Sequence, residues 1–182
     1  MKEFGYQPKD DRTIYNTIGM TLVDAFDLLT DMPDNPQRED MRKAYVKKAD
    51  EVMVKKTYFY DDTIALLQTL QNAGVKVGIV STKYRYRIVN TFNEQAGSLP
   101  VDIIVGGEDV TKAKPDPQGL DLIVERFGAD KSDVLYIGDS YIDAETALNS
   151  GVDFAGVTTG STTKEDFEKY PHIYICLLYT SP

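Results

Sequence analysis

The chain has 182 residues, of which 42% are hydrophobic and 27% charged, with a formal net charge of −9. This size and composition fit one α/β domain with a small satellite. The negative charge argues against broad attraction to nucleic acid, and no apolar run is long enough to span a membrane. A single cysteine, Cys176, excludes an internal disulfide. The N-terminus shows no apolar signal-peptide core, so we expect a cytoplasmic protein.

Residues 1–57 show helical patterns and no convincing strand. Apolar residues in TLVDAFDLLT share one helical face at i, i+4 and i+7. Two prolines then interrupt the chain, and residues 37–56 resume as a second, highly charged helix. Because amphipathic helices without a sheet do not form a core of their own, we expect residues 1–57 to be a helical cap domain.

From residue 58 onward, short apolar runs alternate with helical patterns. Asp61 or Asp62 can cap the first of these helices, and Gly74 can end it. Nearly continuous apolar runs suit strands buried on both faces, and their alternation with helices predicts a parallel sheet. We therefore predict an α/β fold with a Rossmann-like parallel sheet over residues 58–182. The runs are VKVGIVS, VDIIVGG, DVLYIGDS and DFAGVTTG, with helices at 86–95, 118–127 and 142–150.

The C-terminal segment HIYICLLYTSP predicts a last edge strand, because its isoleucines alternate. The only histidine, His172, lies in this segment beside a proline. We expect it to be a solvated surface residue rather than a general base.

Reactive residue types follow three of the predicted strands, at the edge where open parallel sheets bind ligands. Ser81 and Thr82 end the first strand, where a hydroxyl and the backbone N–H groups of a helix start can hold phosphate oxygens. Lys114 lies in a loop stiffened by prolines and supplies a fixed cation. Asp139 and Asp143 are four residues apart across a strand-to-helix turn, so both carboxylates can face one magnesium ion.

Each residue type also has a plainer use. Serine and threonine after a strand are commonly helix caps, and a lysine before a proline is often just solvated. GDSYIDA, by contrast, is a poor helix cap and a good metal site. Residues 83–87 alternate basic and tyrosine side chains, which suggests nucleic-acid stacking. Their helical spacing favours a solvated helix start instead, so we expect no nucleic-acid partner.

The three motifs together resemble those of the haloacid dehalogenase-like (HAD-like) hydrolase superfamily, in its phosphoglycolate phosphatase-like subgroup. VGIVSTK is similar to the second family motif, KAKPDP to the third and YIGDSYIDA to the fourth. The helices of residues 1–57 resemble the cap of this subgroup. Gly19, in NTIGMTL, sits where that cap carries a substrate-specificity loop.

The resemblance implies a magnesium-dependent hydrolase of small-molecule phosphate monoesters. A family aspartate attacks phosphorus to form an aspartyl-phosphate, Mg²⁺ neutralises the phosphoryl oxygens, and cap closure excludes water. The resemblance assigns catalytic roles to Lys114 and Ser81, phosphate or substrate binding to Ser81, Thr82, Lys114 and Gly19, and the metal to Asp139 and Asp143.

The first family motif, an apolar strand ending in D-x-D-x-T, does not occur in this sequence. Asp10 and Asp11 follow FGYQPK, which is not a buried strand. Asp61 and Asp62 are adjacent, so on a strand they point to opposite sides. We expect the chain to lack the nucleophile and the mid-sheet strand that carries it, as a fragment of a larger gene product would, and therefore to be inactive.

Several alternatives remain open at this point. Within the superfamily, a sugar-phosphate mutase or a pyrophosphatase fits the same motifs, whereas a dehalogenase does not need the acidic pair. From another class, the chain could be a non-catalytic fragment that binds phosphate and magnesium. In every case the expected partner is a small phosphorylated metabolite, with no nucleic acid and no membrane.

Overall fold

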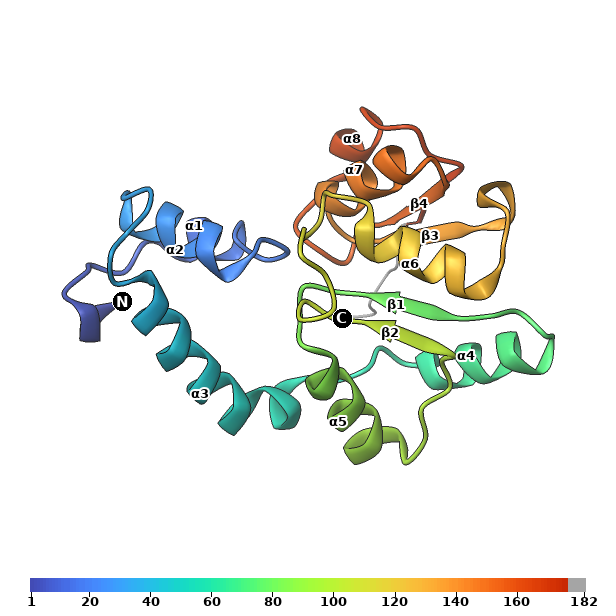
Figure 1. The fold of residues 1–182 in the computed structure, drawn as a ribbon, viewed down its shortest axis with the longest axis horizontal. Helices are drawn as coiled ribbons and strands as arrows, with labels where there is room; N and C mark the ends of the chain where they lie inside the picture. Colours follow the sequence, from blue (N-terminus) through green and yellow to red (C-terminus); the bar gives the residue numbers. More distant parts are fainter. Residues whose placement is uncertain (177–182) are drawn as a thin grey trace. The chain divides into compact units, whose positions relative to one another are not determined.

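The computed structural model describes residues 1–176, which form two compact units. The first unit consists of Met1–Ile14 and Thr21–Glu108, and the second of Tyr15–Met20 and the chain from Asp109 onward. Figure 1 shows the elements in chain order. They are η1 (Lys2–Phe4), α1 (Asp11–Tyr15), α2 (Leu22–Thr30), α3 (Arg38–Lys56), α4 (Thr63–Asn72), β1 (Gly78–Val80), α5 (Arg85–Ala96), β2 (Ile103–Val105), α6 (Gln118–Phe127), η2 (Lys131–Asp133), β3 (Leu135–Gly138), α7 (Tyr141–Ser150), β4 (Asp153–Val157), α8 (Lys164–Phe167) and β5 (Tyr174–Cys176).

The N-terminal part of the first unit is helical. Residues 1–57, all of which the structure describes, contain helices and no strand, as predicted. Phe26 of α2 and Met41 of α3 are buried, and the Phe26 ring meets Tyr45 edge-on at 6.3 Å between centroids. Helices α2 and α3 therefore pack through the apolar stripe seen in the sequence. The division of the chain at residue 57 into cap and core stays a prediction.

Strands β1 and β2 form the parallel sheet of the first unit, with Ile79 opposite Ile104. Phe92 of α5 is buried against this sheet, and its ring lies 4.7 Å from that of Phe59. Helix α4 begins after Asp62, as predicted, but the Asp62 side chain makes no capping bond. Asp62 occupies the N-cap position with a left-handed backbone, φ of 63°, and it is its carbonyl oxygen that accepts a hydrogen bond from the Leu66 N–H at 2.8 Å.

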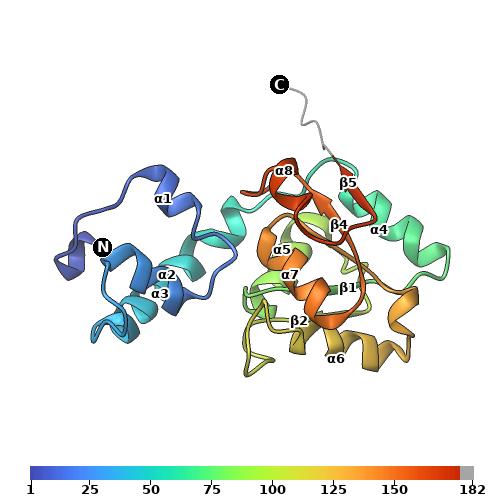
Figure 2. The same cartoon turned by 90° about the horizontal axis from the view of Figure 1, so that it is seen from above.

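Strands β3, β4 and β5 form the parallel sheet of the second unit, in that order. One face of this sheet carries a row of aromatic rings: Phe154 lies 6.4 Å from Tyr136 and 5.6 Å from Phe167. Phe154 and Phe167 are almost completely buried. Helices α7 and α8 lie beside β4 in two perpendicular views (Figures 1 and 2). The row of aromatic rings therefore forms the core of the second unit.

The parallel pairing of the strands is confirmed, but one expectation about the sheet is wrong. The described strands form two separate sheets, β1–β2 and β3–β4–β5, which agrees with the expected lack of a mid-sheet strand between them. Strand β3 is not buried on both faces, because Leu135 and Ile137 are 47% and 59% exposed. Within residues 1–176, β3 has a partner strand on one side only, which leaves its other edge unpaired.

The C-terminal strand and the single histidine agree with expectation. Strand β5 pairs with β4 through Tyr174–Cys176, and residues 177–182 of the predicted tail strand lie outside the described residues. His172 is exposed and its Nδ1 lies 2.8 Å from the Tyr170 carbonyl oxygen. None of the helices in the described part of the chain combines the length and apolar character needed to cross a membrane.

The aromatic row predicts where the second unit is most sensitive to mutation. Phe167→Ala should lower the free energy of unfolding by about 3–5 kcal/mol, because it leaves a cavity against Phe154. The measurement is urea unfolding followed by circular dichroism. The matched control is Tyr174→Ala, because Tyr174 is 63% exposed. It should change stability by no more than about 0.5 kcal/mol, and equal losses in the two variants would contradict this account.

Candidate active site

A buried ion pair lies at the centre of the second unit's polar residues. The Lys114 ammonium Nζ lies 2.6 Å from Asp143 Oδ1, and the two side chains are only 13% and 6% exposed. Lys114 comes from the loop before α6, whereas Asp143 lies in the first turn of α7. Asn149 near the end of α7 donates a hydrogen bond of 2.9 Å to the Pro115 carbonyl oxygen and so also fixes that loop. The predicted lysine is therefore held in one place.

Asp143 receives three further hydrogen bonds. The Tyr136 hydroxyl donates to Oδ1 at 2.9 Å, and the backbone N–H and hydroxyl of Ser140 donate to Oδ2 at 3.1 and 2.6 Å. Ser140 accepts in return from the Asp143 N–H at 3.3 Å, which completes a capping box at the start of α7. The expectation that GDSYIDA is a poor helix cap is therefore wrong. The spacing S-x-x-D was the available signal.

These contacts determine the protonation of the cluster. Burial acts to raise the pKa of Asp143, but the charge of Lys114 and the hydrogen bonds from Lys114, Ser140 and Tyr136 outweigh it, so the pKa is lowered. Burial, the Asp143 charge and the hydrogen bond to Asp143 all raise the pKa of the Tyr136 hydroxyl. At neutral pH Asp143 is thus ionised and Tyr136 remains a proton donor to it.

Asp139 differs from Asp143 in having no side-chain donor. Among the described residues only its own backbone N–H donates to its carboxylate, which is exposed at the end of β3. Desolvation by the surrounding protein raises its pKa and the charge of Asp143 adds to this effect, and together they outweigh the opposite effects of the Lys114 charge and of that backbone hydrogen bond. Gly160 packs tightly here, since a Cβ at that position would lie 2.7 Å from Asp139 Cγ and 2.4 Å from its carbonyl oxygen. The structure thus keeps a bare carboxylate beside an ionised one.

The donor set of this cluster fits a magnesium ion. Mg²⁺ in proteins is commonly held by one or two carboxylates together with waters and phosphate oxygens. Asp139 offers such a carboxylate, while both oxygens of Asp143 are occupied by donors. Residues 1–176 contain no group of three or more His, Cys, Asp or Glu side chains arranged for a metal. Asp139 therefore has the carboxylate that could contact an ion, whereas Asp143 is bonded to Lys114, and the expectation that Asp139 and Asp143 together hold the metal stays a prediction.

Gly19 lies close to the same turn of the second unit. A Cβ added to Gly19 would be 3.7 Å from Ser140 Oγ and 3.6 Å from Ile142 Cδ1. Both are ordinary contact distances, so Gly19 is adjacent to the start of α7. The segment Tyr15–Met20 thus brings a residue from the helical N-terminal part of the chain beside the acidic turn.

In the first unit, Ser81 and Thr82 begin the loop between β1 and α5. The Ser81 N–H continues the strand pairing by donating to the Val105 carbonyl oxygen at 3.0 Å, and its Oγ accepts from the Lys83 N–H at 3.1 Å. The first N–H of α5, on Arg85, donates to both Glu108 carboxylate oxygens at 2.9 and 3.0 Å. The predicted cradle of N–H groups is thus partly filled by the protein itself. The Ser81 hydroxyl acts only as an acceptor in this bond, so it can still donate a hydrogen bond.

The structure therefore brings some of the predicted site residues together. Gly19, Lys114, Asp139 and Asp143 belong to the second unit, and Ser81 and Thr82 belong to the first. That all six serve one pocket stays a prediction. Sequence reasoning missed the bonding partners Tyr136, Ser140 and Glu108, and the close packing of Gly160 against Asp139.

The comparison with known families agrees with the motifs. Residues 1–157 match the model of the haloacid dehalogenase-like hydrolase family, and the chain belongs to this family. Among solved structures, a haloacid dehalogenase-like hydrolase from Bacteroides fragilis is 45% identical with a TM-score of 0.91, and the match covers 96% of this chain and 83% of that one.

Two kinds of curated relative are similar to the chain. A phosphoglycolate phosphatase from Shigella boydii is 28% identical over 148 residues, which cover 81% of this chain and 57% of the relative. Pyrophosphatase PpaX from Listeria monocytogenes is 28% identical over 140 residues, which cover 77% of this chain and 63% of the relative. The chain thus spans less than two thirds of the length of these relatives.

Because the Asp139 carboxylate has no side-chain donor, we expect Asp139→Asn to increase stability in a pH-dependent way. Because the folded pKa of Asp139 is raised, its ionisation destabilises the fold as pH rises above the ordinary value of 3.8. The variant should be more stable at pH 7 by no more than about 1 kcal/mol, since solvent screens an exposed carboxylate. The difference should vanish in acid, as measured by urea unfolding at several pH values.

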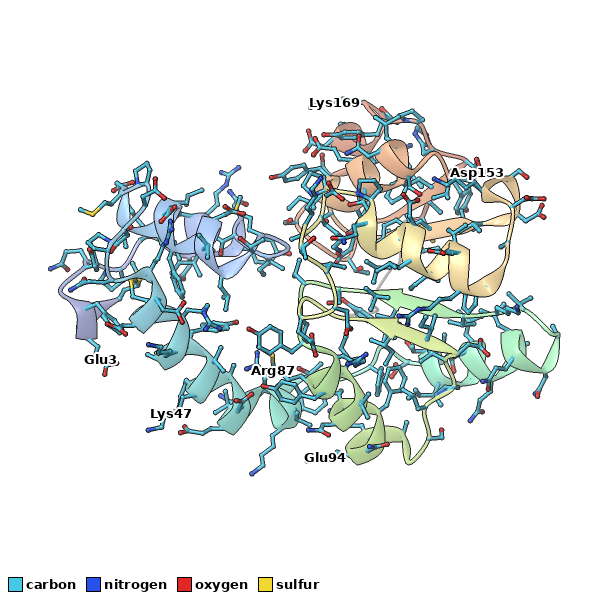
Figure 3. The ribbon with its side chains drawn as sticks, in the orientation of Figure 1. Glu3, Lys47, Arg87, Glu94, Asp153 and Lys169 are labelled. Carbon is cyan, nitrogen blue, oxygen red and sulfur yellow. The ribbon has the colours of Figure 1, made fainter. Side chains whose placement is uncertain are left out.

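The matched control is Asp153→Asn, at the exposed start of β4 (Figure 3). It should leave stability at pH 7 unchanged. An Asp139→Asn variant that is less stable at pH 7 would show that the carboxylate has a donor in solution.

The ion pair predicts a strong, partner-dependent loss of stability. Lys114→Met should cost about 3–5 kcal/mol, because it leaves the Asp143 charge buried without its cation. The double variant Lys114→Met/Asp143→Asn should recover much of this loss, since the charge is then absent and the amide oxygen can still accept from Ser140. Urea unfolding of both variants tests this, and additive losses would contradict the pairing.

Proposed function

We propose that this family member is a magnesium-dependent hydrolase of small-molecule phosphate monoesters, of the phosphoglycolate phosphatase-like kind. The observation that carries the proposal is the buried Lys114–Asp143 pair beside the bare carboxylate of Asp139. This arrangement places the fixed ammonium of Lys114 near a carboxylate that can bind a metal ion. Phosphoryl transfer requires both kinds of charge stabilisation. The phosphatases among the relatives support the same reaction class.

In this proposal each site residue has a defined role. Lys114 stabilises negative charge on the phosphoryl group, and its own position is held by Asp143 and Tyr136. Asp139 would hold Mg²⁺, which supplies charge neutralisation when bound. The Ser81 hydroxyl donates a hydrogen bond to a phosphate oxygen. Thr82, the next residue, also binds the phosphate.

Gly19 would line the substrate side of the acidic turn, which its position beside Ser140 and Ile142 supports. The expected partner is a small phosphorylated metabolite. A cytoplasmic location stays a prediction.

Turnover needs a nucleophile that this sequence does not supply. The full reaction runs through an aspartyl-phosphate on the first-motif aspartate, and no D-x-D-x-T segment follows an apolar strand in these 182 residues. The chain as given should therefore bind phosphate and magnesium without hydrolysing esters.

A pyrophosphatase is the second candidate function, and the similarity to pyrophosphatase PpaX favours it. It would use the same cation, hydroxyl and metal-binding carboxylate, with a phosphate as the leaving group. A sugar-phosphate mutase and a non-catalytic binding protein need the same residues, but no specific observation favours them.

Ligand binding tests the proposal without requiring turnover. Isothermal titration calorimetry should detect orthophosphate binding in the presence of magnesium. Ser81→Ala should weaken it by roughly tenfold or more, because it removes a hydrogen bond to a charged group. Asp139→Asn should weaken magnesium binding, and Asp153→Asn should change neither affinity.

Two results would each overturn one part of the proposal. Unchanged phosphate affinity in Ser81→Ala would remove Ser81 from the site. Hydrolysis of a phosphate ester by the purified chain, abolished by Asp139→Ala, would support the reaction class and overturn the expectation that this chain is inactive. Absence of both phosphate and magnesium binding would contradict the proposed function itself.

A further inference from the structure

Residues 158–163, with the sequence TTGSTT, form a loop between β4 and α8 that the proposed function does not use. Both ends of this loop are fixed by the second unit. The Thr158 N–H donates to the Cys176 carbonyl oxygen of β5 at 3.1 Å. The Thr163 hydroxyl oxygen caps α8 by accepting from the Asp166 N–H at 3.2 Å. The course of the loop is therefore set by a strand at one end and a helix at the other.

The same loop contacts the acidic turn at two points. The buried Thr162 accepts a hydrogen bond of 2.8 Å through its hydroxyl oxygen from the N–H of Tyr141, the first residue of α7. Gly160 lies against Asp139 itself. A Cβ at Gly160 would be 2.4 Å from the Asp139 carbonyl oxygen and 2.7 Å from both its Cγ and its Oδ2, which is closer than real side-chain carbons approach. Only a glycine fits at this position without a shift of its neighbour.

Position 160 needs a glycine for space and not for its backbone conformation. The φ of Gly160 lies outside the left-handed range, which six other glycines of the described chain occupy. Backbone strain therefore does not exclude a side chain at this position. The three heavy atoms nearest to an added Cβ all belong to Asp139, so the obstacle is that one residue.

This contact supplies a constraint that Asp139 otherwise lacks. Asp143 is held by Lys114, Tyr136 and Ser140, whereas no side chain of the described residues donates to the Asp139 carboxylate. Hydrogen bonds from neighbouring side chains therefore do not set its direction. The backbone of Gly160, packed on the Oδ2 side, limits the rotation of the carboxylate instead.

We propose that the loop of residues 158–163 positions the metal-binding carboxylate, with Gly160 as the residue that sets the direction of the Asp139 side chain. This inference rests on the proposed function, in which Asp139 would hold Mg²⁺. Residues that orient a metal ligand typically change metal affinity by about tenfold to a hundredfold when they are mutated. Gly160 would belong to this class although it has no side chain.

A purely structural role for Gly160 is the competing explanation. In that case any loss of metal affinity would follow the loss of stability, and it would not depend on which cation is bound. A positioning role predicts a different result, because Mg²⁺ demands near-ideal octahedral geometry whereas Ca²⁺ accepts a flexible one. The preference for Mg²⁺ over Ca²⁺ therefore distinguishes the two explanations.

The experiment measures the affinities of the whole chain for Mg²⁺ alone and for Ca²⁺ alone, by nuclear magnetic resonance titration. Gly160→Ala should weaken Mg²⁺ binding by about tenfold to a hundredfold and Ca²⁺ binding by less than about threefold. The matched control is Gly156→Ala on β4, where an added Cβ would lie 3.0 Å from the Phe167 ring and not against Asp139. It should lower stability in urea unfolding and leave the ratio of the two affinities unchanged.

A second pair of variants tests the loop if Gly160→Ala does not fold. Thr162→Val removes the acceptor of the Tyr141 N–H and should weaken Mg²⁺ binding by about tenfold. Thr162→Ser keeps the hydroxyl and should retain the affinity of the unmodified chain. Equal Mg²⁺ affinities in the valine and serine variants would overturn the positioning role of the loop.

The remaining outcomes separate this inference from the proposed function. If the unmodified chain binds Mg²⁺ and Gly160→Ala keeps the same affinity, the role of Gly160 is wrong and the proposed metal site stands. An equal loss of Mg²⁺ and Ca²⁺ affinity in Gly160→Ala would also overturn that role. Absence of Mg²⁺ binding by the unmodified chain would overturn the proposed metal site, and this inference with it.

Discussion

The second unit depends on the ion pair between Lys114 and Asp143. Two charges are taken out of water there, which costs several kcal/mol for each ion unless the remaining donors and acceptors are satisfied. The structure satisfies them: Tyr136 and Ser140 complete the bonding of the carboxylate, and the same carboxylate caps α7. Strand β3, helix α7 and the lysine loop are therefore tied at one point. The ammonium position follows from this constraint rather than from the loop alone.

Much of the fold could be predicted from the sequence because the elements have strong local signals. Helix α6 begins and ends where its apolar periodicity and the glycine after it indicate. The exposure of one face of β3 could not be predicted, because a continuous apolar run has the same appearance whether one or both faces are covered. Its unpaired edge, by contrast, agrees with the absence of a strand bearing the first family motif, which the sequence did indicate.

The candidate site shows a similar division. Motif spacing identified Lys114, Asp139 and Asp143, since their residue types follow strand ends. It did not reveal which carboxylate is free, because that depends on the direction of the Tyr136 side chain and on the Ser140 cap. The role of Glu108 could not be predicted for another reason: its carboxylate accepts a hydrogen bond from the backbone N–H of Arg85, which is 23 residues away in the sequence. Tertiary contacts of this kind leave no periodic pattern.

The unequal surroundings of the two aspartates affect how sequences related to this one should be compared. Asp143 holds a helix end and a buried cation, so selection for folding alone would preserve it in a lineage that had abandoned catalysis. Asp139 makes no such bonds and opposes folding slightly at neutral pH. Drift would remove it once cation binding ceased to matter. Retention of Asp139, rather than of Asp143, is therefore the more informative evolutionary marker of a working centre.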